Sequence, residues 1–239
     1  MYRQYLETHP AEWTVLDTFC RIPISRLARE RLVFERLASE VLPTLAGAAT
    51  ARGADNLLCW SAGCASGEEP YSLAILWMLV LAPRYPELSL RVTATDVDEQ
   101  LLERARAAVY RRSSLREVPD EWIAAAFTRS GDLYTVRPEF RAAVHFQLED
   151  VRQVLPPGLF DLVLCRYVAF TYFDEALQRR TLERLLTALR PGGALVIGLK
   201  ERLPGGVDGI EPWVPELRIF RRVGEGHGSD REQANDSAR

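Results

Sequence analysis

Histidine and cysteine, the side chains that bind most transition metals, are scarce in this chain of 239 residues, which has three histidines and four cysteines. No two cysteines have the C-x-x-C spacing of a zinc site, and the histidines are isolated from them. We therefore expect no metal site. Cys59 and Cys165 lie within apolar runs, where cysteine behaves as a small hydrophobic residue. This usage indicates a reducing compartment, the cytoplasm.

Long apolar runs and an excess of one charge are also missing. The longest apolar run, residues 75–82, is far shorter than the ~20 residues that span a bilayer. The first ten residues lack the apolar core of a signal peptide, so neither export nor membrane insertion is expected. The balance of 30 Lys and Arg against 33 Asp and Glu gives a net charge of -3. A protein that mainly binds nucleic acid would carry a more basic surface.

What is present is the composition and the pattern of a folded α/β protein. Hydrophobic residues make up 47% of the chain and charged residues 26%, close to the averages for soluble domains. From about residue 57, short apolar runs alternate with amphipathic ones, which predicts a doubly wound sheet. The expected strands are residues 57–62, 90–95, 144–148, 160–165 and 194–199, and the expected helices are 70–82, 99–108 and 175–189. A last run, 217–223, follows a turn-rich stretch and is expected to add an antiparallel strand.

The chain divides around this alternating region. Residues 1–45 carry apolar residues at helical spacing until Pro43, which should end the run, so we expect an N-terminal helical region there. Residues 46–223 form the main domain, and residues 110–141 interrupt its rhythm as a small inserted β element. The tail, residues 224–239, has no periodic apolar residues and is expected to be disordered.

The segment after the first expected strand, Ser61 to Pro70, is rich in small residues that allow a sharp turn and a close approach of a ligand. A loop at this place lies at the carboxyl edge of the sheet, where such folds bind ligands. Its spacing matches neither the dinucleotide motif nor the phosphate loop. Glu68 and Glu69 occupy the first turn of the next helix, where a phosphate would meet like charge. The loop therefore favours a neutral or cationic ligand.

Acidic residues also follow the next two strands. Asp96 is placed to accept hydrogen bonds from both hydroxyls of a ribose, and Glu149 and Asp150 follow the third strand at the same edge. Acidic strand ends with no lysine among them describe a site for a nucleoside without phosphate. This points to S-adenosylmethionine, whose sulfonium carries a positive charge.

These segments resemble the CheR-type methyltransferases, which modify glutamate residues of chemotaxis receptors. The longest match is WSAGCASGEEPYS at residues 60–72, and shorter ones are Ala94–Asp98, Val109–Arg111, Phe160–Arg166, Tyr172–Asp174 and Leu189–Gly193. The resemblance covers about residues 20–223 and implies a class I methyltransferase, a Rossmann-like fold with a mostly parallel seven-stranded sheet. It also implies S-adenosylmethionine as cofactor and S-adenosylhomocysteine as product.

The resemblance implies roles for individual residues. Asp96 would hold the ribose, Glu69 would lie near the methionine end of the cofactor, and Asp150 would accept from the adenine amino group. Arg29 would pair with the methionine carboxylate, with Arg21 as the alternative. The implied cofactor-binding residues are Arg29, Ser61, Gly63, Glu69, Asp96, Val97, Asp150, Val151 and Arg166, and the implied catalytic residues are Arg166, Tyr167 and Tyr172.

Departures from the family pattern mark this chain as a divergent member with a short N-terminal helical region. Leu27 and Ala28 replace an aromatic pair before Arg29, and Tyr167 stands where the family has Asn, with one extra residue before Tyr172. We expect Tyr167 to shape the acceptor pocket.

The implied methyl acceptor is a carboxylate, which arrives ionised and needs no general base. The acceptor is either a protein glutamate or a small molecule. The alternatives are therefore a small-molecule O- or N-methyltransferase and a cofactor-binding regulatory module without turnover.

Overall fold

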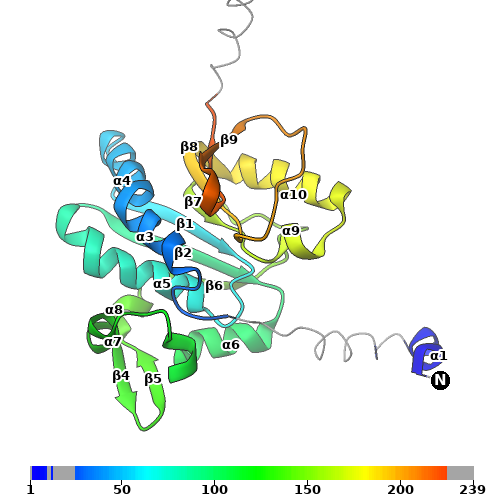
Figure 1. The fold of residues 1–239 in the computed structure, drawn as a ribbon, viewed down its shortest axis with the longest axis horizontal. Helices are drawn as coiled ribbons and strands as arrows, with labels where there is room; N and C mark the ends of the chain where they lie inside the picture. Colours follow the sequence, from blue (N-terminus) through cyan, green and yellow to red (C-terminus); the bar gives the residue numbers. More distant parts are fainter. Residues whose placement is uncertain (1, 10–11, 13–24, 225–239) are drawn as a thin grey trace, which may run out of the picture.

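The computed structural model describes residues 2–9, 12 and 25–224 (Figure 1). Arg21, the expected helical run around residues 13–20 and most of the expected disordered tail lie outside the described residues. In the part of the chain that is described, no helix is both long and apolar enough to cross a membrane.

Seven strands form one sheet in the spatial order β6-β2-β1-β7-β8-β10-β9. They are β1 (Asn56–Ala62), β2 (Ser89–Asp96), β6 (Val144–Leu148), β7 (Phe160–Leu164), β8 (Leu189–Val196), β9 (Ile210–Val214) and β10 (Ile219–Arg222). The pairs from β6 to β8 are parallel, whereas β10 runs antiparallel to both of its neighbours. The doubly wound, mostly parallel sheet is confirmed, and the strand order reverses between β1 and β7, where such sheets bind ligands.

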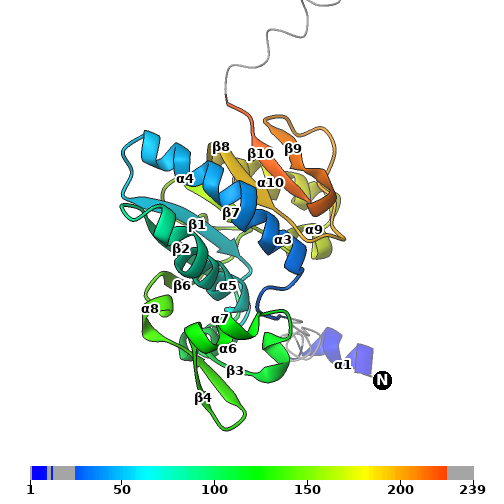
Figure 2. The same ribbon diagram turned by 60° about the vertical axis from the view of Figure 1, so that its left-hand side comes forward.

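The helices cover both faces of this sheet (Figures 1 and 2). On one face lie α3 (Arg31–Arg36), α4 (Leu42–Ala51), α5 (Glu68–Leu76) and α6 (Glu99–Ala107), and on the other lies α10 (Glu175–Ala188). The other α-helices of the described residues are α1 (Tyr2–Thr8), α7 (Asp120–Ala126), α8 (Pro138–Arg141) and α9 (Ala169–Tyr172). Two separate layers of apolar side chains result, one on each face of the central strands.

Pro43 does not end the first helical run, contrary to the expectation from sequence. A π-helical turn, Leu37–Val41, joins α3 to α4, so the helix continues to Ala51 across the expected boundary between residues 45 and 46. Proline removes one backbone donor and its ring needs room beside the preceding turn. A π-helical turn is a local widening of a helix, so it makes that room directly before the proline.

The interrupting segment forms a second, three-stranded antiparallel sheet in the order β3-β5-β4. Its strands are β3 (Val109–Arg111), β4 (Phe127–Ser130) and β5 (Leu133–Val136). The predicted small β element is therefore confirmed. It is bound to the main domain through Tyr110, whose hydroxyl donates to the carbonyl of Ser66 at 2.7 Å.

Strand β9 is not predicted from the sequence, because its residues belong to a turn-rich stretch. Glycines precede it and Pro212 lies within it, so the segment lacks a strand signature. Proline is tolerated there because β9 is the edge strand of the sheet. The expected antiparallel strand, β10, is confirmed and pairs with β9.

Asp161 holds the amino end of β7 to its surroundings. Its side chain is 3% exposed, and its Oδ1 is 2.6 Å from Arg52 Nη2. Its Oδ2 accepts from the backbone N–H of Leu58 at 2.9 Å, and Arg190 Nε lies 3.5 Å from Oδ1. A buried carboxylate with this many partners costs much to replace, because removing its charge leaves the arginines uncompensated.

We predict that Asp161→Asn lowers the free energy of unfolding by about 2 kcal/mol. Urea denaturation measures it. Glu35→Gln is the matched control, since Glu35 pairs with Arg31 on the surface with both side chains at least 49% exposed, and it should cost under ~0.5 kcal/mol. Equal losses in the two variants would contradict a special role for the buried pair.

Candidate active site

A cavity of about 550 Å³ opens at the carboxyl edge of the sheet, beside the point where the strand order reverses. Its volume lies within the roughly 300–1,000 Å³ typical of small-molecule sites. The predicted site residues that line it are Arg29, Gly63, Glu69, Asp96, Val97, Asp150, Val151, Arg166, Tyr167 and Tyr172. Ser61 instead lies fully buried next to the lining, and its hydroxyl donates to Glu69 Oε1 at 2.7 Å.

The loop after β1 packs so closely against its neighbours that two of its positions require glycine. Gly63 has φ +74°, and a Cβ atom there would lie 2.2 Å from the Val168 side chain. Gly67 has φ +87° and a Cβ there would meet Ala105 at 2.9 Å. A side chain fits at neither position, and of the two glycines Gly63 lines the cavity.

Asp96 is the acidic residue best placed to accept from a bound nucleoside. Its Oδ2 accepts from the N–H of Ala65 at 2.8 Å and its Oδ1 from the N–H of Asp98 at 3.0 Å. Burial raises the pKa of Asp96, and these backbone N–H groups oppose the shift. Each carboxylate oxygen can accept a further hydrogen bond, so both ribose hydroxyls can be bound here.

Asp150 and Glu149 differ in how far their acceptor capacity is already used. The carboxylate of Asp150 is 2.6 Å from Arg152 Nη2 and also accepts from Gln153 at 3.2 Å. The hydrogen bond from Arg152 lowers the pKa of Asp150. Glu149, by contrast, has a buried Oε2 with no hydrogen-bond partner among the described residues. An acceptor buried in this way is stabilised when a ligand donates to it.

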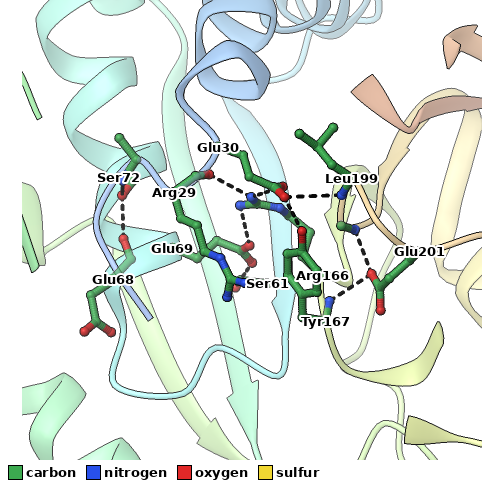
Figure 3. Close-up of polar contacts among 12 residues, drawn as sticks. Arg29, Glu30, Ser61, Glu68, Glu69, Ser72, Arg166, Tyr167, Leu199 and Glu201 are labelled. Carbon is green, nitrogen blue, oxygen red and sulfur yellow. Dashed lines mark hydrogen bonds and ion pairs between the residues drawn. The ribbon is translucent and has the colours of Figure 1, made fainter. Parts of the chain in front are cut away.

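Arg166 joins three segments at the centre of the site (Figure 3). Its side chain is 3% exposed, and its guanidinium donates to Glu69 at 3.1 Å, to Glu30 at 2.7 Å and to the carbonyl of Arg29 at 2.7 Å. Burial alone would lower the pKa of Arg166, but the two carboxylates outweigh it and raise that pKa. The arginine therefore stays charged and holds the segment before α3 against α5.

Tyr167 has a left-handed backbone, with φ +60°. Its hydroxyl donates to Glu30, and the Arg29 guanidinium lies 4.1 Å from the centre of its ring. Burial raises the pKa of Tyr167, and the carboxylate of Glu30 adds to the shift. The phenol is thus protonated and already engaged within the protein.

Tyr172, at the end of α9, lies on the rim of the cavity with 76% of its surface exposed. The short helix α9 also contains buried Phe170, and Thr171 donates to Glu201 at 2.6 Å. The segment with the extra residue before Tyr172 therefore forms the helical turn α9. Buried Phe170 and the hydrogen bond of Thr171 anchor this turn, and Tyr172 lies at the surface.

Two site residues were missed by sequence reasoning. Glu30 binds Arg166 and Tyr167, and its signal was its position directly after Arg29 in the family segment. Glu201, which is 3% exposed, accepts from the N–H groups of Tyr167 at 2.8 Å and Gly198 at 2.7 Å. Nothing in its local sequence signalled this contact, because its partners lie on two different strand ends.

The donor and acceptor set fits S-adenosylmethionine. The cavity is large enough, its acids are not paired with lysine, and the unpartnered Glu149 oxygen can accept from a ligand. Among the described residues, no cluster of three or more His, Cys, Asp or Glu is arranged to hold a metal ion. His145 is exposed and does not line the cavity.

Comparison with known proteins decides the family. A family model described as "CheR methyltransferase, SAM binding domain" matches residues 24–214. The chain belongs to this family. It is therefore an S-adenosylmethionine-dependent methyltransferase of the CheR type, and the resemblance seen in the sequence is confirmed.

Relatives with similar sequences include three bacterial proteins. This CheR-type chain is 33% identical over 197 residues to a chemotaxis protein methyltransferase of Listeria innocua, covering 81% of this chain and 72% of that protein. It is 34% identical over 229 residues to the probable biofilm formation methyltransferase WspC of Pseudomonas aeruginosa, covering 92% of this chain and 50% of WspC. It is 34% identical over 227 residues to an uncharacterized 104.1 kDa protein of Rhodobacter capsulatus, covering 93% of this chain and 23% of that protein.

We predict that Asp96→Asn weakens binding of S-adenosylhomocysteine by about 2 kcal/mol, because two ribose hydroxyls lose a charged acceptor. Isothermal titration calorimetry measures it. Asp98→Asn is the control, since Asp98 caps α6 and does not line the cavity. Unchanged affinity in Asp96→Asn would place the ribose elsewhere.

The raised pKa of Asp96 gives the affinity a pH dependence. The ionised carboxylate is the stronger acceptor, and a raised pKa means that it is lost at a higher pH than an exposed aspartate would lose it. Affinity for S-adenosylhomocysteine should therefore fall as the pH is lowered through the range in which Asp96 becomes protonated, and this range lies above that of an exposed aspartate. Calorimetry across this range should show a smaller fall in Asp96→Asn, and parallel curves for both proteins would refute the assignment.

Proposed function

We propose that this CheR-type chain transfers a methyl group to a carboxylate of a protein, on a glutamate side chain. The observation that carries the proposal is that neither histidine, the most frequent general base, nor lysine lines the cavity among the described residues. A carboxylate acceptor is already ionised at neutral pH and needs no base, whereas an alcohol or ammonium acceptor must lose a proton.

The proposed reaction is an in-line displacement at the methyl carbon. When bound, S-adenosylmethionine supplies the methyl group on a positively charged sulfur. The protein then has to align the acceptor and exclude water. Arg29 would pair with the methionine carboxylate, Asp96 would hold the ribose, and Asp150 together with Glu149 would face the adenine. Glu69 would lie near the methionine end, held by Ser61 and Arg166.

Tyr172 supports a macromolecular acceptor over a small molecule. It is the most exposed large aromatic side chain at the cavity, with 76% of its surface open to solvent. An enclosed small-molecule site would bury such a ring, whereas a tyrosine on a rim is the kind of residue that anchors a protein partner. We propose that Tyr172 contacts the segment that carries the acceptor glutamate.

We also propose that the reaction takes place in the cytoplasm. Three free cysteines, Cys59, Cys64 and Cys165, are buried in the described part of the chain. Burial raises the pKa of the Cys165 thiol to about 12, so this thiol stays protonated and unreactive. Unpaired thiols are typical of a reducing compartment.

The acceptor proposal predicts methyl esters as product. Incubating the protein with a bacterial lysate and methyl-tritiated S-adenosylmethionine should label protein, and mild alkali should release the label as methanol. Methyl esters hydrolyse under these conditions, whereas N-methyl groups and ethers do not. Asp96→Asn should label less at low cofactor concentration and recover at saturation. Alkali-stable label, or label only in small molecules, would refute a protein carboxylate as acceptor.

A further inference from the structure

Tyr167 stands at the carboxyl end of β7, yet its side chain contacts Arg29 and Glu30, residues of the segment before α3. We propose that Tyr167 is a positioning residue: its ring holds the Arg29 guanidinium in the orientation that binds the methionine carboxylate of the cofactor. The inference rests on the cofactor placement given under the proposed function. It assigns to the phenol ring a role in cofactor selectivity instead of the role in the acceptor pocket expected from sequence.

The contact between Arg29 and Tyr167 is a stack. The guanidinium carbon of Arg29 lies 4.1 Å from the centre of the Tyr167 ring. A planar guanidinium uses its face in such a contact and binds a carboxylate with the N–H groups on its edge. Stacking and anion binding are therefore compatible in one arginine. Because the stack restricts a long side chain before the ligand arrives, less entropy is lost on binding.

Gly198, which follows the end of β8, limits the position of the same ring. A Cβ atom at position 198 would lie 2.7 Å from Tyr167 Cζ and 2.8 Å from both Cε atoms. Real side-chain atoms do not approach so closely, so the ring can occupy this place only because residue 198 is glycine. In Figure 3, Arg29 lies on one side of the ring and Leu199, the neighbour of Gly198, on the other. The ring is held between the two segments.

Both ends of Tyr167 are fixed as well. Its hydroxyl donates to Glu30, whose other oxygen accepts from Arg166 at 2.7 Å, and its backbone N–H donates to buried Glu201 at 2.8 Å. The phenol hydroxyl is thus engaged by Glu30 within the protein. The family's asparagine would suit the left-handed backbone at this position better than tyrosine does. A bulky residue in a strained conformation points to a function for its ring.

The inference can be tested by binding alone, with two nucleosides that differ at the end that Arg29 would contact. S-adenosylhomocysteine carries the amino-acid group, whereas 5′-methylthioadenosine keeps the adenine, ribose and sulfur without it. Calorimetry on the unaltered protein should show tighter binding of S-adenosylhomocysteine, by on the order of tenfold or more. The ratio of the two dissociation constants measures how well the amino-acid end is recognised.

Removing the ring should reduce this ratio without changing how tightly the adenine and ribose are bound. Tyr167→Leu and Tyr167→Asn should weaken S-adenosylhomocysteine roughly threefold to thirtyfold, the range of a cation–π contact, and leave 5′-methylthioadenosine unchanged. Leucine keeps the backbone strain and asparagine relieves it, so agreement between them assigns the effect to the ring. Tyr167→Phe should retain most of the ratio, and Gly198→Ala, which displaces the ring, should reduce it. Asp96→Asn should weaken both nucleosides equally, and thermal unfolding checks that each variant is folded.

The outcomes separate this inference from the placement on which it rests. If Arg29→Ala lowers the ratio and neither ring-deleting variant does, the role of Tyr167 is wrong and the cofactor placement stands. If Arg29→Ala leaves the ratio unchanged, both are wrong. If Tyr167→Phe lowers the ratio as much as Tyr167→Leu does, the hydrogen bond to Glu30 orients Arg29 and the stack does not. No methyl acceptor is present, so the identity of the acceptor does not enter.

Discussion

The buried charge of Arg166 is the constraint on which the rest of the site depends. A guanidinium that is 3% exposed has lost its hydration, and only a close set of acceptors compensates for that loss. Its acceptors come from far apart in the chain: Glu69 lies in the first turn of α5, and Glu30 and the Arg29 carbonyl precede α3, whereas Arg166 itself follows β7. These three segments must therefore assemble together, and the cavity exists because they do.

Strained backbone is concentrated around the same cavity. Ala28, Glu30, Ala65 and Tyr167 all have positive φ angles without being glycine. Each lies in a segment that lines the cavity or binds Arg166. Such conformations persist only where surrounding contacts determine them, and they accumulate at functional sites because a site requires particular directions of its side chains. The buried ion pairs and hydrogen bonds of this region provide those contacts.

The sequence predicted what depends on local pattern. The alternating apolar runs located β1, β2, β6, β7 and β8, and the small-residue loop located the ligand-binding edge of the sheet. Contacts between distant residues were beyond such reasoning. Glu30 and Tyr167 are 137 positions apart, and Glu201 gave no local signal for its role. The edge strand β9 and the continuation of the helix past Pro43 were missed because proline and glycine carry a turn signal that tertiary structure overrides.

The helix from α3 to α4 and the strand β7 run beside each other with an ion pair at both ends. Glu30 meets Arg166 where the strand ends, and Arg52 meets Asp161 where the strand begins. The helix and the strand are thus linked by one ion pair near each of their ends. Neither end of the helix can swing outward alone without breaking a buried charge contact. The π-helical turn Leu37–Val41 lies between the two ion pairs. It is the place where the helix can bend while both ion pairs stay formed.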